Sequence, residues 1–241
     1  MSWLNPVYKR VLLKISGEAL AGDQKRGLDF DIVRKVCQSI KTCIELGVEI
    51  GVVVGGGNFS RGMLDGGGKM DRTRADHMGM MATVMNCLAV ADMLEQINVP
   101  VQVQTALDIK AVAEPYVKLK ADKYLSNGNA VIFGCGTGNP YFSTDTAAVL
   151  RAAEIGAEVI LLAKNVDGVY TADPKKDPNA RRLESITYAD MLAQRLTVMD
   201  LTAASLALDN DIPVILFALH DPDNIVRVVT GEQIGTRVSC G

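Results

Sequence analysis

The sequence is poor in residue types on which several common chemistries depend. It has two histidines, His77 and His220, and no Ser-His catalytic pair is apparent. Its five cysteines form no C-x-x-C pair and are irregularly spaced, which favours buried thiols in a reducing compartment over disulfides or a zinc site. The formal net charge of -3 gives no general attraction to nucleic acid or to an anionic membrane, so an anion site must be local.

Two patterns that commonly mark phosphate sites are absent as well. No stretch matches G-x-x-x-x-G-K-[ST], so a Walker A loop is excluded, and Gly55-Gly56-Gly57 lacks the G-x-G-x-x-G spacing of a dinucleotide-binding turn. The N-terminus has no basic segment followed by an apolar one, and no apolar run approaches the length that spans a bilayer. We therefore expect a cytoplasmic protein that does not enter a membrane.

Apolar strands alternate with helical patterns along most of the chain. Apolar residues make up 48% of the 241 residues, enough for a full core. The expected strands cover 7–15, 48–54, 100–104, 130–134, 157–163 and 214–218, and the expected helices cover 29–46, 71–97, 144–155, 187–195 and 201–209. Such alternation predicts an α/β fold with a mostly parallel sheet covered on both faces. The polar segment 166–185 is the longest break and a candidate lobe boundary or lid.

Three of the expected strands run directly into glycine. The first leads into Ser16-Gly17, the second into Gly55-Gly56-Gly57, and the fourth into the segment G-C-G-T-G-N-P at 134–140. Turns without side chains leave backbone N–H groups exposed at the edge of a sheet, which is how α/β proteins hold phosphate. Three such turns in one chain predict a site with several phosphate groups to hold.

Cationic side chains accompany the first two turns. Lys14 lies in an otherwise apolar strand, where an ammonium is costly unless it reaches solvent or an anion, and we favour the anion. Ser16 and Gly17 would offer N–H groups to the same anion. Arg61 follows the glycine triplet closely enough to clamp a phosphate, although a solvated loop arginine is the better interpretation when it is taken alone.

The segment 136–145 carries groups suited to a nucleoside. It combines two glycines, an amide, a proline, two aromatic rings and several hydroxyls, so the rings can line a flat base while Asn139 and the hydroxyls read its edges. The segment leads into a helix capped by Ser143 or Thr144. Asp145 near that helix start satisfies the dipole, or organises lysines or a metal-bound phosphate.

Three polar residues outside these turns are further candidates for nucleotide contacts. Asp76, inside the long expected helix, can accept both hydrogens of a ribose diol or be a surface or capping aspartate. Lys164 can reach phosphate oxygens, and Tyr170 can pack on an adenine ring.

The methionines of the long expected helix 71–97 are expected to fill the core rather than to form a special surface; they are Met78, Met80, Met81 and Met85.

These residues together resemble the amino-acid kinase family, and within it the bacterial uridylate kinases, nearly from end to end. The wider family is marked by K-I-S-G at 14–17, by the glycine triplet and by V-D-G-V-Y-T-A-D-P at 166–174. The stretches D-H-M-G-M at 76–80 and G-T-G-N-P-Y-F-S-T-D at 136–145 are more specific to the uridylate kinases. Each motif alone is weak, and together they are strong.

The resemblance implies a three-layer αβα sandwich around a mostly parallel sheet of roughly eight strands. It implies one domain over 1–241, with the acceptor bound mainly by residues 1–155 and ATP by residues 156–241. The resemblance to the uridylate kinases implies transfer of the γ-phosphoryl group of ATP to UMP, giving UDP for pyrimidine nucleotide biosynthesis. Mg²⁺ is expected on the ATP phosphates, without a dedicated metal site in the protein. Members are commonly homohexamers, activated by GTP and inhibited by UTP.

The resemblance also assigns roles by position. The catalytic residues would be Lys14, Arg61 and Asp145, of which Asp145 matches a residue that organises catalytic lysines. The ATP-binding residues would be Lys14, Ile15, Ser16, Gly17, Gly57, Arg61, Lys164, Tyr170 and Asp173. The UMP-binding residues would be Gly56, Asp76, Thr137, Gly138, Asn139, Pro140, Tyr141, Phe142, Ser143 and Thr144.

The scarcity of histidine is no obstacle to this chemistry. A phosphate acceptor is already an anionic nucleophile at neutral pH, so transfer to UMP needs no general base. In-line positioning and charge cancellation, here by Lys14, Arg61 and the glycine N–H groups, are the main requirements. Two alternatives remain open at this point. One is a relative that phosphorylates a small acid such as acetylglutamate, aspartate or carbamate, and the other is a non-catalytic uridine-nucleotide sensor.

Overall fold

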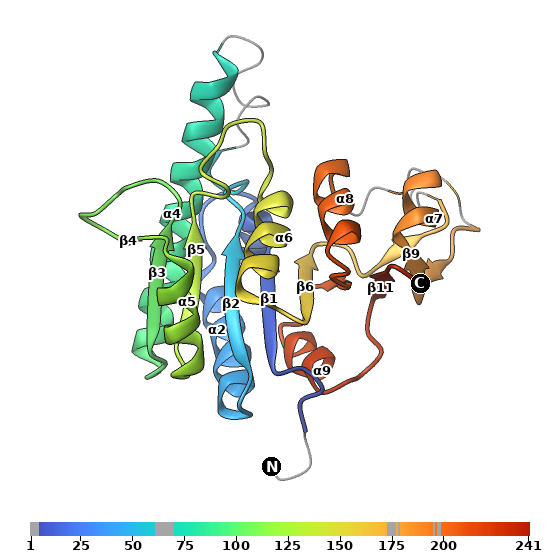
Figure 1. Cartoon of the computed structure of the whole chain (residues 1–241), viewed down its shortest axis with the longest axis horizontal. Helices are drawn as coiled ribbons and strands as arrows, with labels where there is room; N and C mark the ends of the chain where they lie inside the picture. The colour runs from blue at the N-terminus through green and yellow to red at the C-terminus, as the bar shows by residue number, and fades with distance from the viewer. Residues whose placement is uncertain (1–4, 61–69, 173–176, 178, 195, 197–198) are drawn as a thin grey trace.

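The central element of the fold is one nine-stranded sheet, seen in a computed structural model that describes residues 5–60, 70–172, 177, 179–194, 196 and 199–241 (Figure 1). The strand order is β4-β3-β5-β2-β1-β6-β10-β11-β9. The strands are β1 (Arg10–Ile15), β2 (Glu49–Val54), β3 (Val101–Thr105), β4 (Glu114–Pro115), β5 (Ala130–Gly134), β6 (Val159–Lys164), β9 (Ser185–Thr187), β10 (Val214–Ala218) and β11 (Thr236–Ser239). Neighbouring strands are parallel except β10 and β11, which confirms the predicted, mostly parallel sheet.

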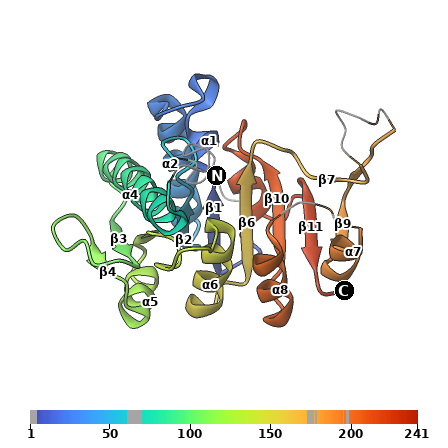
Figure 2. The same cartoon turned by 90° about the horizontal axis from the view of Figure 1, so that it is seen from above.

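Helices cover both faces of the sheet and complete the predicted three layers (Figure 2). One face carries α1 (Gly17–Leu20), α2 (Phe30–Glu45), α4 (Arg72–Gln96) and α9 (Asn224–Val229). The other face carries α5 (Lys118–Ser126), α6 (Thr144–Ile155), α7 (Tyr188–Ala193) and α8 (Leu201–Asp209). A short 3-10 helix, η1 (Gly22–Gln24), follows α1.

Strand β1 shows how the sheet divides the core and where it places Lys14. Val11, Leu13 and Ile15 are fully buried among the helices of the first face, whereas Leu12 packs with the helices of the second. Each such side chain contributes about 1.5–3 kcal/mol by leaving water. Because successive side chains of a strand point to opposite faces, Lys14 shares the face of Leu12, which α6 covers.

The carboxyl ends of the central strands meet at one edge of the sheet. In the parallel register, Ile15 pairs with both Val54 and Ala163, and Val53 pairs with Phe133. The turns that follow β1, β2 and β5 therefore lie side by side at that edge. This confirms that the three strand-glycine junctions converge, as the sequence pattern indicates.

Several elements differ from the expectations. The strand expected from Val7 begins at Arg10, and the expected break 166–185 contains a small antiparallel sheet of β7 (Val169–Tyr170) and β8 (Arg182–Leu183). The sequence patterns missed α1, α5, α9, β4, β9 and β11. These elements are short, and α5 buries only Ala121 and Leu125, so they give little periodicity to detect.

The long helix α4 corrects one expectation, which concerns its methionines. Met80 is buried, but Met78, Met81 and Met85 are 50%, 40% and 47% exposed, so these three do not fill the core. By length and composition α4 is also the one described helix long and apolar enough to cross a membrane, but 56% of its most apolar window is buried inside the protein, as in a core helix.

Candidate active site

The carboxylate of Asp145 lies between two lysines at the carboxyl edge of the sheet. Its Oδ1 is 2.5 Å from Nζ of Lys14, and its Oδ2 accepts a hydrogen bond from Nζ of Lys164 at 2.9 Å. Lys14 comes from β1 and Lys164 from the end of β6, the next strand, and both share the face that α6 covers. Asp145 stands in the first turn of α6, so three separate elements bring these charges together.

Burial and charge oppose each other in this cluster. Burial lowers the pKa of Lys14 most strongly, and Lys164 lowers it further, while Asp145 and Asp200 counteract part of that shift. Burial raises the pKa of Asp145, but the ammonium groups of Lys14 and Lys164 outweigh it, so the pKa ends below its ordinary value. The cluster thus holds two ammonium groups side by side at the carboxyl edge, an arrangement that suits a polyanion.

A second carboxylate, Asp200, joins the starts of α6 and α8. Its Oδ1 accepts a hydrogen bond from the backbone N–H of Ala203 at 2.9 Å and so caps α8. Its Oδ2 accepts hydrogen bonds from the hydroxyl of Ser143, directly before α6, and from that of Thr146 within α6. Ser143 in turn caps α6 by accepting from the N–H groups of Asp145 and Thr146. The N-termini of both helices, which carry partial positive charge, are thereby held beside the lysines.

The glycine triplet is anchored by a buried pair of amides. Asn58 and Asn86 donate hydrogen bonds to each other's side-chain oxygens at 3.0 and 2.8 Å. Asn86 also donates to the carbonyl of Gly55 at 2.7 Å, and Asn58 donates to the carbonyl of Gly27. The close approach leaves no room for side chains, because a Cβ at Gly17 would lie 2.4 Å from the Gly55 carbonyl oxygen.

A cavity of about 380 Å³ opens between the triplet, α4 and the loop after β5. Its walls include Gly56, Asp76, Thr137, Phe142, Ser143 and Thr144, all of which are sequence-predicted UMP-binding residues. A larger cavity of about 1000 Å³ adjoins it and shares Arg72, Asp76, Phe142 and Ser143 as lining residues. The larger cavity extends from these shared residues to Asp200, and we refer to the two adjoining cavities together as the recess.

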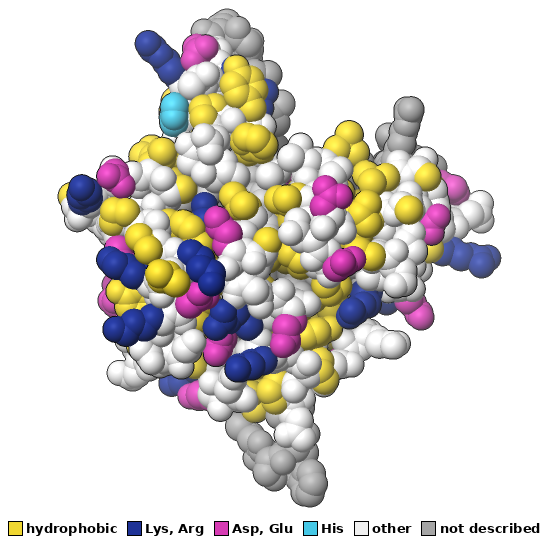
Figure 3. Space-filling view, in the orientation of Figure 1, with side chains coloured by type: hydrophobic (Ala, Val, Ile, Leu, Met, Phe, Trp, Pro, Cys, Tyr) yellow, Lys and Arg dark blue, Asp and Glu magenta, His cyan; other side chains and the backbone are white. Residues whose placement is uncertain are grey.

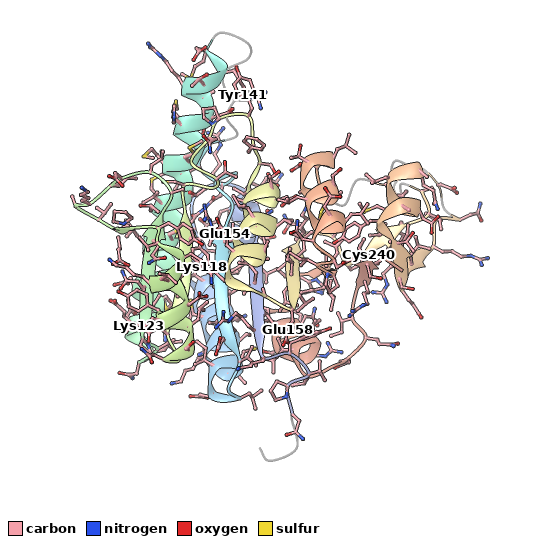
Figure 4. The ribbon with its side chains drawn as sticks, viewed as in Figure 1. Lys118, Lys123, Tyr141, Glu154, Glu158 and Cys240 are labelled. Carbon is pink, nitrogen blue, oxygen red and sulfur yellow. The ribbon has the colours of Figure 1, made fainter. Side chains whose placement is uncertain are left out.

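Asp76 binds protein groups in this recess. Its Oδ2 accepts hydrogen bonds from Nε of Arg72 at 2.9 Å and from the backbone N–H of Tyr141 at 2.8 Å. The guanidinium of Arg72 also lies 5.1 Å from the centre of the Tyr141 ring. Figure 4 shows Tyr141 on the loop beside the start of α4. Both contacts of Asp76 fall on one oxygen, so a ribose hydroxyl can meet the other.

Other predicted residues are placed as follows. Thr137 and Asn139 bond to each other within their own turn, and Gly138 has a positive φ of 78°. Tyr170 lies in the β7–β8 sheet, where its hydroxyl contacts the carboxylate of Asp167. The carboxyl edge of the sheet carries Ile15, Ser16 and Gly57, and the loop after β5 carries Pro140. Arg61 and Asp173 fall outside the described residues, so their predicted roles stay predictions.

Sequence reasoning assigned no role to three residues that the site uses. They are Arg72, Asn86 and Asp200, and each contacts a predicted site segment. A signal existed for Asp200, because an aspartate directly before an apolar helical pattern is a typical N-cap. A second signal was the amide of Asn86 within an apolar helix, because a buried amide needs a hydrogen-bond partner.

Comparison with known proteins finds similar sequences and structures over most of the chain. A profile of the amino acid kinase family matches residues 9–218. The crystal structure of UMP kinase from Bacillus anthracis is 39% identical, with a TM-score of 0.93 over 97% of this chain and 96% of that one. UMP kinase from Ureaplasma parvum is 38% identical, with a TM-score of 0.91 over 96% and 98% of the two chains. Uridylate kinase from Archaeoglobus fulgidus is 26% identical, with a TM-score of 0.74 over 95% and 99%.

Proposed function

The chain belongs to the amino acid kinase family, and on that premise we propose that it transfers the γ-phosphoryl group of ATP to UMP, giving UDP. It is then a nucleoside monophosphate kinase. The observation that supports this most directly is the placement of Lys14, Asp145 and Lys164 at the sheet edge where three glycine turns meet, beside the acceptor cavity. Cations gathered beside one recess suit phosphoryl transfer, because the charge on the transferred group has to be neutralised.

UMP would occupy the cavity between α4 and the loop after β5. Gly56 would approach its phosphate, Asp76 its ribose and the segment 137–144 its base. The exposed rings of Tyr141 and Phe142 are available for stacking, and the turn at Thr137 and Asn139 offers amide and hydroxyl groups. A volume of about 380 Å³ lies in the range of small-molecule sites.

ATP would bind along the carboxyl ends of β1 and β6. Its phosphates would meet Lys14, Ser16, Gly17, Gly57 and Lys164, with Ile15 beside them. Arg61, Tyr170 and Asp173 are proposed to complete the donor site by the resemblance alone. Residues 1–155 would thus hold the acceptor together with part of the ATP phosphates, residues 156–241 would hold the rest of ATP, and Asp200 links the two parts through α6.

The transfer would be direct and in line. A phosphate oxygen of UMP forms a bond to the γ-phosphorus while the bond from that phosphorus to the β,γ-bridging oxygen breaks, and ADP leaves with the electron pair. No proton has to be removed from the acceptor, so no general base is needed. Lys14 would neutralise charge on the transferred group, and Asp145 would hold Lys14 in place.

The nearby carboxylates do not form a metal cage. Asp145 contacts two lysines, and Asp200 contacts two hydroxyls and a helix N-terminus. Among the described residues, no cluster of three or more His, Cys, Asp or Glu side chains could hold a metal ion. This donor set fits Mg²⁺ carried on the ATP phosphates, with water as its other ligands. When bound there, Mg²⁺ would neutralise the leaving phosphate oxygens.

Assembly, regulation and location are proposed on the family pattern. The exposed residues Met78, Met81, Met85 and Leu88 form an apolar stripe on α4 that is suited to an interface between subunits. A homohexamer is proposed on the resemblance alone. GTP activation and UTP inhibition are expected effects, with cytoplasmic pyrimidine nucleotide biosynthesis as the setting. Lys and Arg alternate with Asp and Glu on the face seen in Figure 3, which supports small-molecule rather than nucleic-acid partners.

A coupled assay of ADP release tests the function. The purified chain is given MgATP with UMP, CMP, acetylglutamate, aspartate or carbamate in turn. ADP release with UMP well above the release with the small acids supports the proposal. Release with a small acid would instead indicate a small-acid kinase of the same family. Binding of UMP or UTP without any ADP release would indicate a nucleotide sensor.

A further inference from the structure

The loop after β5 is bracketed by two residues in a backbone conformation that side chains disfavour. Cys135 has a φ of 64° and Tyr141 a φ of 73°, in the left-handed region that glycine adopts readily. Gly136 and Gly138, between them, also have positive φ, but no Cβ opposes them. Non-glycine residues stay in this region only where surrounding contacts hold them.

Side chains of α4 provide such a contact at each end of the loop. The hydroxyl of Thr83 accepts a hydrogen bond from the backbone N–H of Cys135 at 2.9 Å. The carboxylate of Asp76 accepts one from the backbone N–H of Tyr141 at 2.8 Å. Asp76 and Thr83 lie about two turns apart and so occupy the same side of α4. One helix face therefore binds both left-handed residues.

Thr83 is held rigidly enough to act as a fixed acceptor. Its hydroxyl donates to the carbonyl of Met80 at 2.6 Å, so a lone pair remains for Cys135. The residue is 2% exposed and lines the acceptor cavity. The same turn of α4 also receives the glycine triplet, because a Cβ at Gly56 would lie 2.8 Å from the Gly79 carbonyl oxygen and 3.1 Å from the Thr83 nitrogen.

We propose that Thr83 is a positioning residue for the acceptor nucleotide. Its hydroxyl holds Cys135 in the left-handed conformation and, together with Asp76 at the other end, presets the loop 136–140 for the base of the acceptor. This inference rests on the proposed function, because that loop is the proposed base-binding segment. A loop that already has its binding conformation loses little further freedom when the ligand arrives.

Loss of the Thr83 hydroxyl should weaken the binding of UMP and leave the transfer step unchanged. Without the hydroxyl, the buried N–H of Cys135 loses its partner, and the loop no longer keeps its preset form. UMP should then bind more weakly, whereas the transfer step at Lys14 should proceed normally once UMP is bound. The expected signature is a raised KM with kcat nearly unchanged.

Two variants of similar shape test the hydroxyl. Thr83→Val keeps the branched shape and removes the hydroxyl, whereas Thr83→Ser keeps the hydroxyl. Titration calorimetry with UMP, without ATP, should show the Kd raised about threefold to tenfold in Thr83→Val. In Thr83→Ser the Kd should stay within about twofold of wild type, and in both variants kcat should stay within about twofold.

A second substitution tests the role of the left-handed conformation. Glycine at position 135 adopts that conformation without the hydroxyl's help, so Cys135→Gly should recover most of the affinity lost in Thr83→Val. The same change in the wild-type chain should alter the Kd far less, and the difference between the two backgrounds measures the coupling. Equal effects in both backgrounds would overturn the link between Thr83 and the conformation of Cys135.

The remaining outcomes are distinguishable. If wild type does not bind UMP at all, the proposed function fails; if wild type binds and Thr83→Val binds equally well, only this inference fails. A loss of kcat at unchanged Kd would also overturn it. Should Thr83→Val not fold, hydrogen exchange of the wild-type chain without UMP decides the question. A protected Cys135 amide supports the inference, and a rapidly exchanging one overturns it.

Discussion

The ammonium of Lys14, in the fifth position of β1, lies 2.5 Å from the carboxylate of Asp145, in the first turn of α6. The lysine is 5% exposed, and its pKa is lowered chiefly by that burial. Asp145 offsets part of this cost and fixes the direction of the lysine side chain. The pair therefore keeps a desolvated cation in place before any nucleotide binds, which is the preorganisation that phosphoryl transfer exploits.

The first prediction concerns Lys14 itself. Lys14→Met removes the cation and keeps an unbranched side chain, so kcat should fall by about 100-fold or more while the Kd for UMP changes little. Steady-state kinetics with UMP and MgATP, combined with calorimetry, measures both. Lys9→Met is the matched control, because Lys9 lies just before β1 at the opposite edge of the sheet. Unchanged turnover in Lys14→Met would remove Lys14 from the catalytic role.

A second prediction concerns the pH dependence of stability. The pKa of Asp145 is below its ordinary value of 3.8 in the folded chain, so its stabilising effect is fully present above pH 3.8. As the pH falls through the folded pKa, Asp145 takes up a proton and the effect is lost. Asp145→Asn should lower the free energy of unfolding by about 3 kcal/mol at pH 7, because a buried pair is broken.

Urea unfolding of wild type and Asp145→Asn over a range of pH checks this. The difference between the two proteins should be largest near pH 7 and should shrink below pH 3.8, where a protonated aspartic acid resembles asparagine. A difference of constant size from pH 7 to pH 3 would contradict the ion-pair origin of the effect.

The third prediction concerns ribose recognition by Asp76. Asparagine can still accept the hydrogen bond from Tyr141 N–H, so Asp76→Asn preserves the loop contact but weakens the one to a ribose diol. The KM for UMP should rise about tenfold, and the preference for UMP over dUMP should shrink. Asp92→Asn, on the exposed side of the same helix, should leave both unchanged. A selective loss of ATP binding would contradict the ribose assignment.

A fourth prediction compares two glycines that lie near each other. Gly56→Ala would place a methyl 2.8 Å from the Gly79 carbonyl oxygen, so we expect a loss of about 1–3 kcal/mol in the free energy of unfolding and weaker UMP binding. Gly79→Ala meets nothing within 4 Å and replaces a glycine inside a helix, so it should stabilise the chain by about 0.5–1 kcal/mol. Urea unfolding of both variants measures these changes. Equal changes in the free energy of unfolding would contradict the tight contact between the glycine triplet and α4.

The sequence was most informative where local pattern and strand direction suffice. Parallel strands that end in glycine must bring their turns to one edge, so the convergence of Gly17, Gly55 and Gly136 could be predicted. The partner of Asp145 could not be chosen from sequence, because a carboxylate in a first turn serves the helix dipole equally well. The contact of Asn86 with Gly55 depends on how α4 lies across β2, which no local pattern specifies.

Exposure within α4 shows the same limit. Apolar residues occur around the whole helix, so periodicity does not identify the buried side, and three methionines expected in the core are exposed instead. The Thr83 contact with Cys135 joins residues far apart in the chain and is equally invisible to periodicity.

Phosphorus NMR of the chain with MgATP and UMP tests the central claim most directly. If a phosphoryl group passes straight from ATP to UMP across this recess, the γ-phosphate signal of ATP should fall as the β-phosphate signal of UDP rises in equal amount, with no orthophosphate. Loss of the γ-phosphate signal to orthophosphate, or no change while UMP remains bound, would contradict it.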